Sequence, residues 1–413
     1  MNTISRSQRD VLVIGIIGLV HLLSHAYQFT LAPLFPFIAG SYEQGGIGVS
    51  YTQLGLLASL FFASSGLFQT PAGFLVDRIG ARPVLICGLG ILSLSVFCYS
   101  LAPNYAFLAL LSIIAGIGNS VFHPADYSLI NGAVSKQHLG KAYSAHSIGG
   151  YIGFAIAPAA LPLIEPLLGW RGAVAIAGGI GITVALFLLF WKPNLNMDSS
   201  QQLNKGSSDP KSLSAGLHIL IQPTILLGFF FFFILAMGLI GFKTMGPTAL
   251  HEGWQFSVVF SGNAIAAFST AGVLGIALGG IWADRSENHN QNAVRAFSLS
   301  GVFLLVIPVV PNIPVLVFAL LIIAGLFFGF ALPSRDLFIR SLTPPGASGR
   351  VFGFVYCGLD VGASLTPILF GWLMDGGRAE LVFIAAGCLI LFSAAVISIT
   401  DILVQKLESG SGS

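Results

Sequence analysis

The chain has 413 residues and a net charge of +2; 55% of its residues are hydrophobic and only 8% are charged. Soluble domains carry about 25% charged residues, so this composition excludes a water-soluble globular protein. The near-neutral charge gives no reason to expect nucleic-acid binding, and the four cysteines lie in apolar stretches without metal-ligand spacing.

Apolar stretches of about 20 residues, the length that crosses a bilayer as a helix, follow one another along the whole chain. We predict an all-α membrane protein whose twelve transmembrane helices form two pseudo-symmetric six-helix bundles. The first stretch is too long for a cleavable signal peptide. The predicted spans are 11–39, 50–76, 83–102, 105–133, 139–164, 171–191, 218–250, 255–283, 294–311, 314–339, 350–374 and 379–404.

The distribution of Lys and Arg predicts the orientation of these spans. With the N-terminus inside, the outer loops hold only Arg171 and Arg378. This asymmetry predicts a multi-pass protein of the bacterial inner (plasma) membrane with both termini in the cytoplasm. The basic residues on the cytoplasmic side are Arg6, Arg9, Arg78, Arg82, Lys136, Lys141, Lys192, Lys205, Lys211, Arg285, Arg295, Arg340, Arg350 and Lys406.

The polar interval 193–217 is rich in Ser, Asn, Gln and Lys, which predicts a flexible cytoplasmic linker between bundles 1–192 and 218–406. Residues 407–413 end in SGSGS and are interpreted as a tail left by an expression vector. The halves repeat each other: at an offset of 209, Pro124 falls on Pro333 and Gly149 on Gly358, and GFLVDR matches GIWADR. Both copies start on the same side, so the repeat is parallel.

Polar residues in the first span share one helical face. His21, His25 and Gln28 recur at i, i+4 and i+7. Because His titrates near neutrality, we predict proton transfer for His21 and His25, and substrate binding for His25, Tyr27 and Gln28. The alternative is hydrogen bonding to neighbouring helices. Metalloenzymes with an HxxxH pair need several such boxes, so we predict no metal site.

The segment FHPADYSLI places a histidine, a proline and an aspartate inside an apolar span. Pro124 frees a backbone carbonyl, which predicts a hinge. We predict that Asp126 is a gate residue that pairs with an arginine of the nearby 77–82 loop when the cytoplasmic side closes; the alternative is a solvated helix end. His123 is predicted to line the cavity and to share protons with His146, which is also a candidate substrate contact; a structural hydrogen bond is the alternative for His146.

Three charged residues are predicted inside spans of the second half. Asp360 lies near mid-membrane, where a carboxylate is costly, and is predicted to couple protons. Lys243 precedes Gly246-Pro247, expected to interrupt its helix, and either pairs with Asp360, binds an anionic substrate or snorkels outward. Arg335 takes the place of Asp126 in the repeat and is a predicted substrate contact.

The segment GFLVDRIGAR (73–82), with its degenerate second copy and twelve spans, resembles the loop signature of the major facilitator superfamily. FHPADYSLI followed by GKAYSAHSIGGYIGFAIAP resembles the fosmidomycin-resistance-type branch of efflux proteins. The chain departs from the family at Ala81, Ser112 and Ala157, where a basic residue, an arginine and a glycine are usual. Besides Asp126, the predicted gating residues are Gly73, Asp77, Arg78, Gly80, Arg82, Asp284, Arg285, Asp336 and Arg350.

These features predict a transporter and not an enzyme. We expect a monomeric, proton-coupled secondary transporter that moves a small anionic or amphiphilic molecule by alternating access and needs no cofactor besides the proton gradient. The efflux resemblance implies export by proton antiport, as in drug or metabolite efflux and antibiotic resistance. The alternatives are a proton symporter for an organic anion, a membrane-embedded metalloenzyme and a sensor that binds ligand without moving it.

Overall fold

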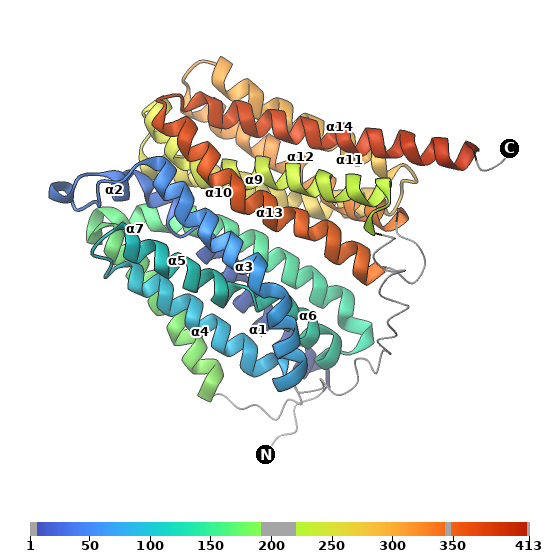
Figure 1. Ribbon diagram of the computed structural model, residues 1–413, viewed down its shortest axis with the longest axis horizontal. Helices are drawn as coiled ribbons and strands as arrows, with labels where there is room; N and C mark the ends of the chain where they lie inside the picture. The colour runs from blue at the N-terminus through green and yellow to red at the C-terminus, as the bar shows by residue number, and fades with distance from the viewer. Residues whose placement is uncertain (1–5, 191–219, 343–347, 411–413) are drawn as a thin grey trace. The chain divides into compact units, whose positions relative to one another are not determined.

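The computed structural model describes residues 6–190, 220–342 and 348–410, and all regular structure in these ranges is helical (Figure 1). The chain forms two compact units, Met1–Asn204 and Lys205–Ser413. The predicted linker 193–217 lies outside the described residues, so its flexibility and the bundle boundaries stay predictions.

Local sequence signals mark the starts of two long helices of unit 1, α3 and α5. Ser50 and Gln53 form a capping box at the start of α3, in which the Ser50 side chain accepts from the Gln53 N–H. Gly80, at φ 94°, separates α3 from α4 in a conformation that favours glycine. The helices are α1 (Arg6–Gln28), η1 (Ala32–Leu34), α2 (Phe35–Ala39), η2 (Tyr42–Gln44), α3 (Tyr51–Ile79), α4 (Ala81–Tyr99), α5 (Tyr105–Asn119), α6 (Phe122–Ala133), η3 (Lys136–His138) and α7 (Leu139–Phe190).

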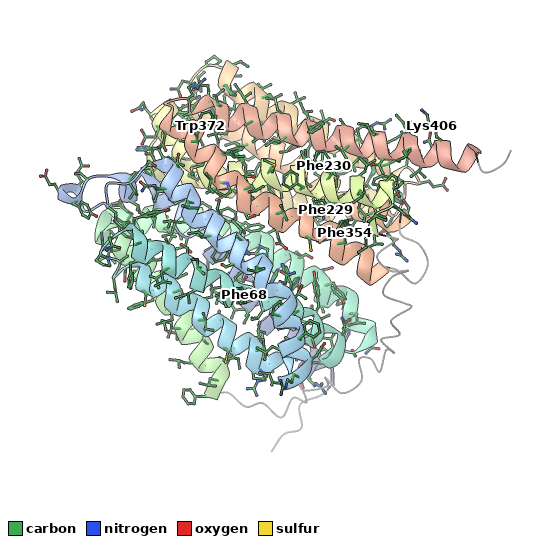
Figure 2. All side chains as sticks on the ribbon, viewed as in Figure 1. Phe68, Phe229, Phe230, Phe354, Trp372 and Lys406 are labelled. Carbon is green, nitrogen blue, oxygen red and sulfur yellow. The ribbon has the colours of Figure 1, made fainter. Side chains whose placement is uncertain are left out.

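Unit 2 is built around α9, which packs against α13 and α14, while α12 packs against α10 and α11. Phe229 of α9 stacks on Phe354 of α13 with ring centroids 5.1 Å apart (Figure 2). Aromatic contacts of this kind fill the interior of the unit. Its helices are α9 (Pro223–Trp254), α10 (Val258–Ala283), α11 (His289–Val306), η4 (Ile307–Val309), α12 (Pro314–Ser341), α13 (Ser348–Asp375) and α14 (Glu380–Gly410).

Eleven helical segments among the described residues are long and apolar enough to cross a membrane. The longest, Leu139–Phe190, contains two predicted spans that meet at Gly169, whose φ of 67° and ψ of 170° are not helical. The structure therefore agrees with the twelve-helix prediction. Large apolar side chains also face outward, among them Phe68 at 40% and Trp372 at 62% exposure (Figure 2), which suits lipid and not water.

Two predicted features differ from the structure, and one span holds a detail that the sequence did not predict. The predicted span 105–133 coincides with one candidate membrane span, Tyr105–Ala133, in which a short turn separates α5 from α6. Conversely, α9 runs unbroken through Pro247, where an interruption was expected, because a proline can be accommodated where neighbouring helices supply the packing. The last helix continues to Gly410, into the residues predicted to be a separate tail.

Glycines set how closely the helices approach in both units. A Cβ at Gly149 would lie 2.6 Å from the Gly18 carbonyl oxygen, and one at Gly153 would collide with the Leu22 carbonyl. In unit 2, a Cβ at Gly358 would collide with the carbonyl of Phe229 in the same way. Such backbone contacts need small residues, so the two units repeat the packing of α1 on α7 as α9 on α13.

We expect Gly153→Ala to destabilise the protein by about 1–3 kcal/mol, because the added methyl group has no space against α1. The matched control is Gly179→Ala on the second half of α7, where nothing lies within 4 Å of the added Cβ. Thermal unfolding in detergent should show a lower midpoint for Gly153→Ala alone. Equal midpoints for the two variants would contradict this packing.

Candidate functional site

A buried cluster of ionisable side chains lies inside unit 1; it consists of His21, His25, His123, Asp126 and His146, and we call it the histidine–aspartate cluster. Its members come from three elements: α1, α6 and the first half of α7. Residues that are far apart in the sequence thus meet within one bundle.

Asp126 is the centre of the cluster. Its Oδ2 lies 3.0 Å from Nδ1 of His21 and 3.3 Å from Nε2 of His146. The three residues are 0%, 2% and 3% exposed, so water does not solvate the carboxylate. The second oxygen, Oδ1, is buried without a hydrogen-bond partner among the described residues. A buried carboxylate needs such partners, because desolvation of an isolated charge is very costly.

The remaining two histidines extend the cluster. The ring centroid of His21 lies 4.3 Å from that of His25 and 5.4 Å from that of His123. His123 is also 6.1 Å from His146, so the structure brings together the two rings that were predicted to face each other. The four imidazoles therefore form one contiguous group beside Asp126.

Local sequence explains how these side chains meet. The rings of His21 and His25 pack against Gly150 of α7. A Cβ at this position would lie 3.1 Å from each ring, so a glycine is needed for the rings to come this close. On the other side, the break between α5 and α6 precedes His123 and Asp126, and Pro124 removes a helical hydrogen bond there. In the HPAD segment, the side chains of His123 and Asp126 point toward α1 and α7.

The geometry limits how many protons the cluster holds. The rings of His21 and His146 are stacked with centroids 3.5 Å apart. Two imidazolium cations at this distance repel strongly, whereas one cation beside Asp126 is stabilised. The cluster therefore suits the gain and loss of one proton shared among several sites, which is the behaviour of a coupled titration.

The cluster also contains ligand types that bind transition metals. Ring nitrogens of His21, His123 and His146 all lie within 4.8 Å of one another. Tetrahedral zinc with bonds of about 2.0–2.1 Å brings its ligand atoms to about 3.4 Å, so these side chains would have to move. His21 and His146 each contact Asp126 through one ring nitrogen only, and the absence of a metal site stays a prediction.

The signature loop is placed differently from what was expected. Asp126 contacts two histidines, and Arg82, one of its predicted partners, instead donates to the Leu188 carbonyl at 3.1 Å near the end of α7. Asp77 and Arg78 are exposed at the end of α3. An ion pair between Asp126 and a loop arginine, expected when the cytoplasmic side closes, is not among those of the described residues, where the carboxylate instead meets His21 and His146. The gating roles stay predictions.

Tyr27 also departs from its predicted role. Its side chain is 6% exposed, and its hydroxyl donates to the Ala177 carbonyl at 2.7 Å. This places it against the second half of α7, where it joins two helices. Gln28 is the last residue of α1 and is half-buried. The sequence identified the face of His21 and His25 correctly, but it could not distinguish Tyr27 as a packing residue.

Unit 2 holds a different polar group in the corresponding place. Both Nε and Nη2 of Arg335 lie 2.8 Å from Asp336 Oδ1, and its guanidinium lies 5.0 Å above the Phe232 ring. Tyr356 donates to the same Asp336 oxygen at 3.1 Å. This group joins α9, α12 and α13, the counterparts of the helices that carry the histidine–aspartate cluster.

Lys243 and Asp360 lie on neighbouring helices, α9 and α13, of unit 2. Lys243 is 3% exposed, and Asp360 is half-buried one turn after Tyr356. The suggested ion pair between them is not among those formed by residues 220–342 and 348–410. Asp284 ends α10 and is exposed together with Arg285, while the Arg350 side chain lies outside the described ones.

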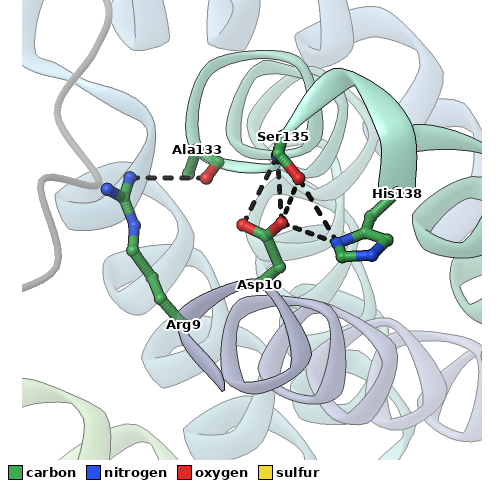
Figure 3. Close-up of polar contacts among 5 residues, drawn as sticks. All are labelled: Arg9, Asp10, Ala133, Ser135 and His138. Atoms are coloured by element: carbon green, nitrogen blue, oxygen red, sulfur yellow. Dashed lines mark hydrogen bonds and ion pairs between the residues drawn. The ribbon is translucent and has the colours of Figure 1, made fainter. Parts of the chain in front are cut away.

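A second polar group, which the sequence analysis missed, ties α1 to the link between α6 and α7 (Figure 3). Asp10, 1% exposed, accepts from the Ser135 hydroxyl and lies 2.8 Å from His138 Nδ1. Beside it, Arg9 donates to the Ala133 carbonyl at 3.3 Å. The sequence signal that could have predicted this group is Asp10 itself, a carboxylate at the start of an apolar helix. These contacts join α1 to the end of α6 and to η3.

Comparison with known proteins agrees with this fold. Residues 17–294 and 247–405 match the Major Facilitator Superfamily, so the chain belongs to that family. Its members are transporters, and the chain is accordingly a transporter of small molecules and not an enzyme.

Among curated relatives, the probable sulfoacetate transporter of Cupriavidus necator is 24% identical over 92% of this chain and 91% of its own length. The D-galactonate transporter of Escherichia coli O6:H1 is 24% identical over 88% of this chain and 91% of its own. A bacterial homolog of the human lysosomal transporter Spinster, solved in an inward-facing and occupied conformation, has a TM-score of 0.75 at 16% identity, covering 95% and 97% of the two chains.

We expect Asp126→Ala to destabilise the protein by about 3–5 kcal/mol, because it removes the partner of two buried imidazoles. Asp126→Asn keeps an acceptor oxygen and should cost less. Melting in detergent, with the exposed Glu43→Ala as control, checks this order. An Asp126→Ala protein as stable as the control would show that the buried contacts contribute nothing.

Proposed function

We propose that the protein is a proton-coupled secondary transporter of a small organic anion. The observation that carries this proposal is the buried Asp126 carboxylate shared by His21 and His146. Intramembrane carboxylates and histidines that pair with one another are typical of proton relays in transporters. The comparisons support the anion, since relatives are named for sulfoacetate, galactonate and hexuronate.

The proton side of the mechanism belongs to unit 1. A proton arriving at the histidine–aspartate cluster converts an anionic group into a neutral one, which lowers the cost of keeping it buried. His25 and His123, at the edge of the cluster, are half-buried and provide the route to and from Asp126. Asp360 of unit 2 is a second candidate, because it is a half-buried carboxylate in a membrane span.

The anion side belongs to unit 2. The Arg335 guanidinium presents a planar set of donors that matches a carboxylate or sulfonate, and its present partner is the adjacent Asp336. A substrate anion would exchange with Asp336 at this guanidinium. On α9, Lys243 is accompanied by the buried Thr244 and Thr248, whose hydroxyls are additional donors within two turns.

The direction we propose is symport, in which the proton and the anion move together. It is supported by the separate cationic and proton-binding groups described above, which can hold an anion and a proton at the same time. Export by proton antiport is the second candidate, because FHPADYSLI and the segment after it resemble fosmidomycin-resistance-type efflux proteins. The same cluster serves either direction, and the sign of the proton flux distinguishes them.

We expect proteoliposomes of defined orientation, containing a pH dye, to acidify inside when D-galactonate, a hexuronate or sulfoacetate enters. Asp126→Asn and Asp360→Asn test the two carboxylates, and the exposed Glu43→Gln is the matched control. Loss of proton flux in Asp126→Asn alone assigns coupling to the histidine–aspartate cluster. Protons that move opposite to the anion would replace symport with antiport, and a wild type that moves no protons would refute the proposal.

Arg335→Gln should raise the KM for the transported anion about tenfold or more, because a charged hydrogen bond to the carboxylate is lost. Arg340→Gln, on the same helix but exposed, is the control and should leave the KM unchanged. Initial rates of radiolabelled anion uptake at several concentrations provide the measurement. An unchanged KM in both variants would remove Arg335 from the binding site.

A further inference from the structure

Three polar side chains, the buried Ser24 and Ser65 and the half-buried Asn119, join α1, α3 and α5 at the point where the fourth transmembrane segment breaks. The Ser24 hydroxyl donates to Asn119 Oδ1 at 2.7 Å, and Asn119 Nδ2 donates to Ser65 Oγ at 2.9 Å. Ser24 is 1% exposed and Ser65 is 6% exposed. Asn119 is part of GIGNS, a sequence that otherwise provides small residues for helix contacts. It is also the last residue of α5.

The break follows directly after this network. Asn119 ends α5, Ser120 and Val121 form a turn, and α6 begins at Phe122. In unit 2 the corresponding helix, α12, is continuous from Pro314 to Ser341 and contains Pro333, the counterpart of Pro124. The proline is present in both halves, so it does not explain the break by itself.

The packing contacts identify what stands in place of the network in unit 2. A Cβ at Gly325 would collide with the Phe268 carbonyl, and a Cβ at Gly116 would collide with the Phe61 carbonyl. These equivalent contacts match α12 to α5 and α10 to α3. Extending these matches, and that of α9 to α1, gives apolar counterparts for all three residues. Asn119, Ser24 and Ser65 correspond to Phe328, Leu235 and Gly272.

We propose that Asn119 is a positioning residue that sets where the histidine–aspartate cluster forms, an inference that rests on the proposed proton coupling. Its two hydrogen bonds hold the end of α5 against α1 and α3. Ser24 lies between His21 and His25 on α1, and His123 and Asp126 follow within two turns of Asn119. The network therefore fixes the separation of Asp126 from His21, although Asn119 touches neither residue.

The test uses the full-length protein with labelled histidine in lipid nanodiscs, without any substrate. Ring-nitrogen NMR signals of His21, assigned with His21→Gln, are followed against pH. We expect Ser24→Ala and Ser65→Ala to move the midpoint of this titration by about 0.5 pH unit or more, since altered contact with Asp126 changes proton binding. Asn119→Leu, which removes both bonds, should cause the larger shift.

The matched control is Ser64→Ala, which removes a part-buried hydrogen bond from α3 to the Ile113 carbonyl of α5 and one to the Leu60 carbonyl within α3, but leaves Asn119 bonded. An unchanged midpoint in both Ser24→Ala and Ser65→Ala would overturn the proposal, and so would an equal shift in the control. The two serine variants keep the test valid if Asn119→Leu fails to fold. Because no transport is measured, a failed positioning role is distinguishable from a failed transport proposal.

Discussion

The burial of the Asp126 carboxylate is the constraint on which the rest of unit 1 depends. A charge removed from water must be matched by hydrogen-bond donors or by a proton, because unpaired burial costs several kcal/mol, about 3–5 when one partner is lost. The partners here come from α1 and α7, so one side chain fixes the rotation of three helices. Gly150 serves this requirement directly, since α7 makes room there for the rings of His21 and His25, whereas Gly149 and Gly153 serve the backbone contact with α1 that unit 2 repeats.

The two halves of the chain share packing and differ in chemistry. Phe232 stands where unit 1 has His21, and Arg335 stands where it has Asp126. One half therefore presents a proton-binding set and the other a cation that lies over an aromatic ring. In the proposed transporter, this difference lets the proton and the anion bind at separate groups. A duplicated bundle can keep its backbone contacts and change function through a few inward-facing positions.

The sequence was sufficient for the spans and the repeat, because both depend on apolar length and on residue identity at fixed spacing. It also placed His21 and His25 on one face, which follows from helical periodicity. It did not identify the partners of Asp126, because these depend on how far each helix rotates when it packs. Nor did it distinguish Pro124, which lies after a break, from Pro333, which lies in a continuous helix, because the neighbours of each proline decide the outcome.

The tie between Asp10 and Ser135 has a consequence for how the protein is made. The two residues are 125 positions apart, so the first helix enters the membrane long before its polar partners exist. At about 5–20 residues per second, a ribosome needs roughly 6–25 seconds to supply them. During that interval the insertion machinery and the lipid must accommodate an aspartate that the finished bundle buries. The first helix is thus synthesised well before the residues that secure it.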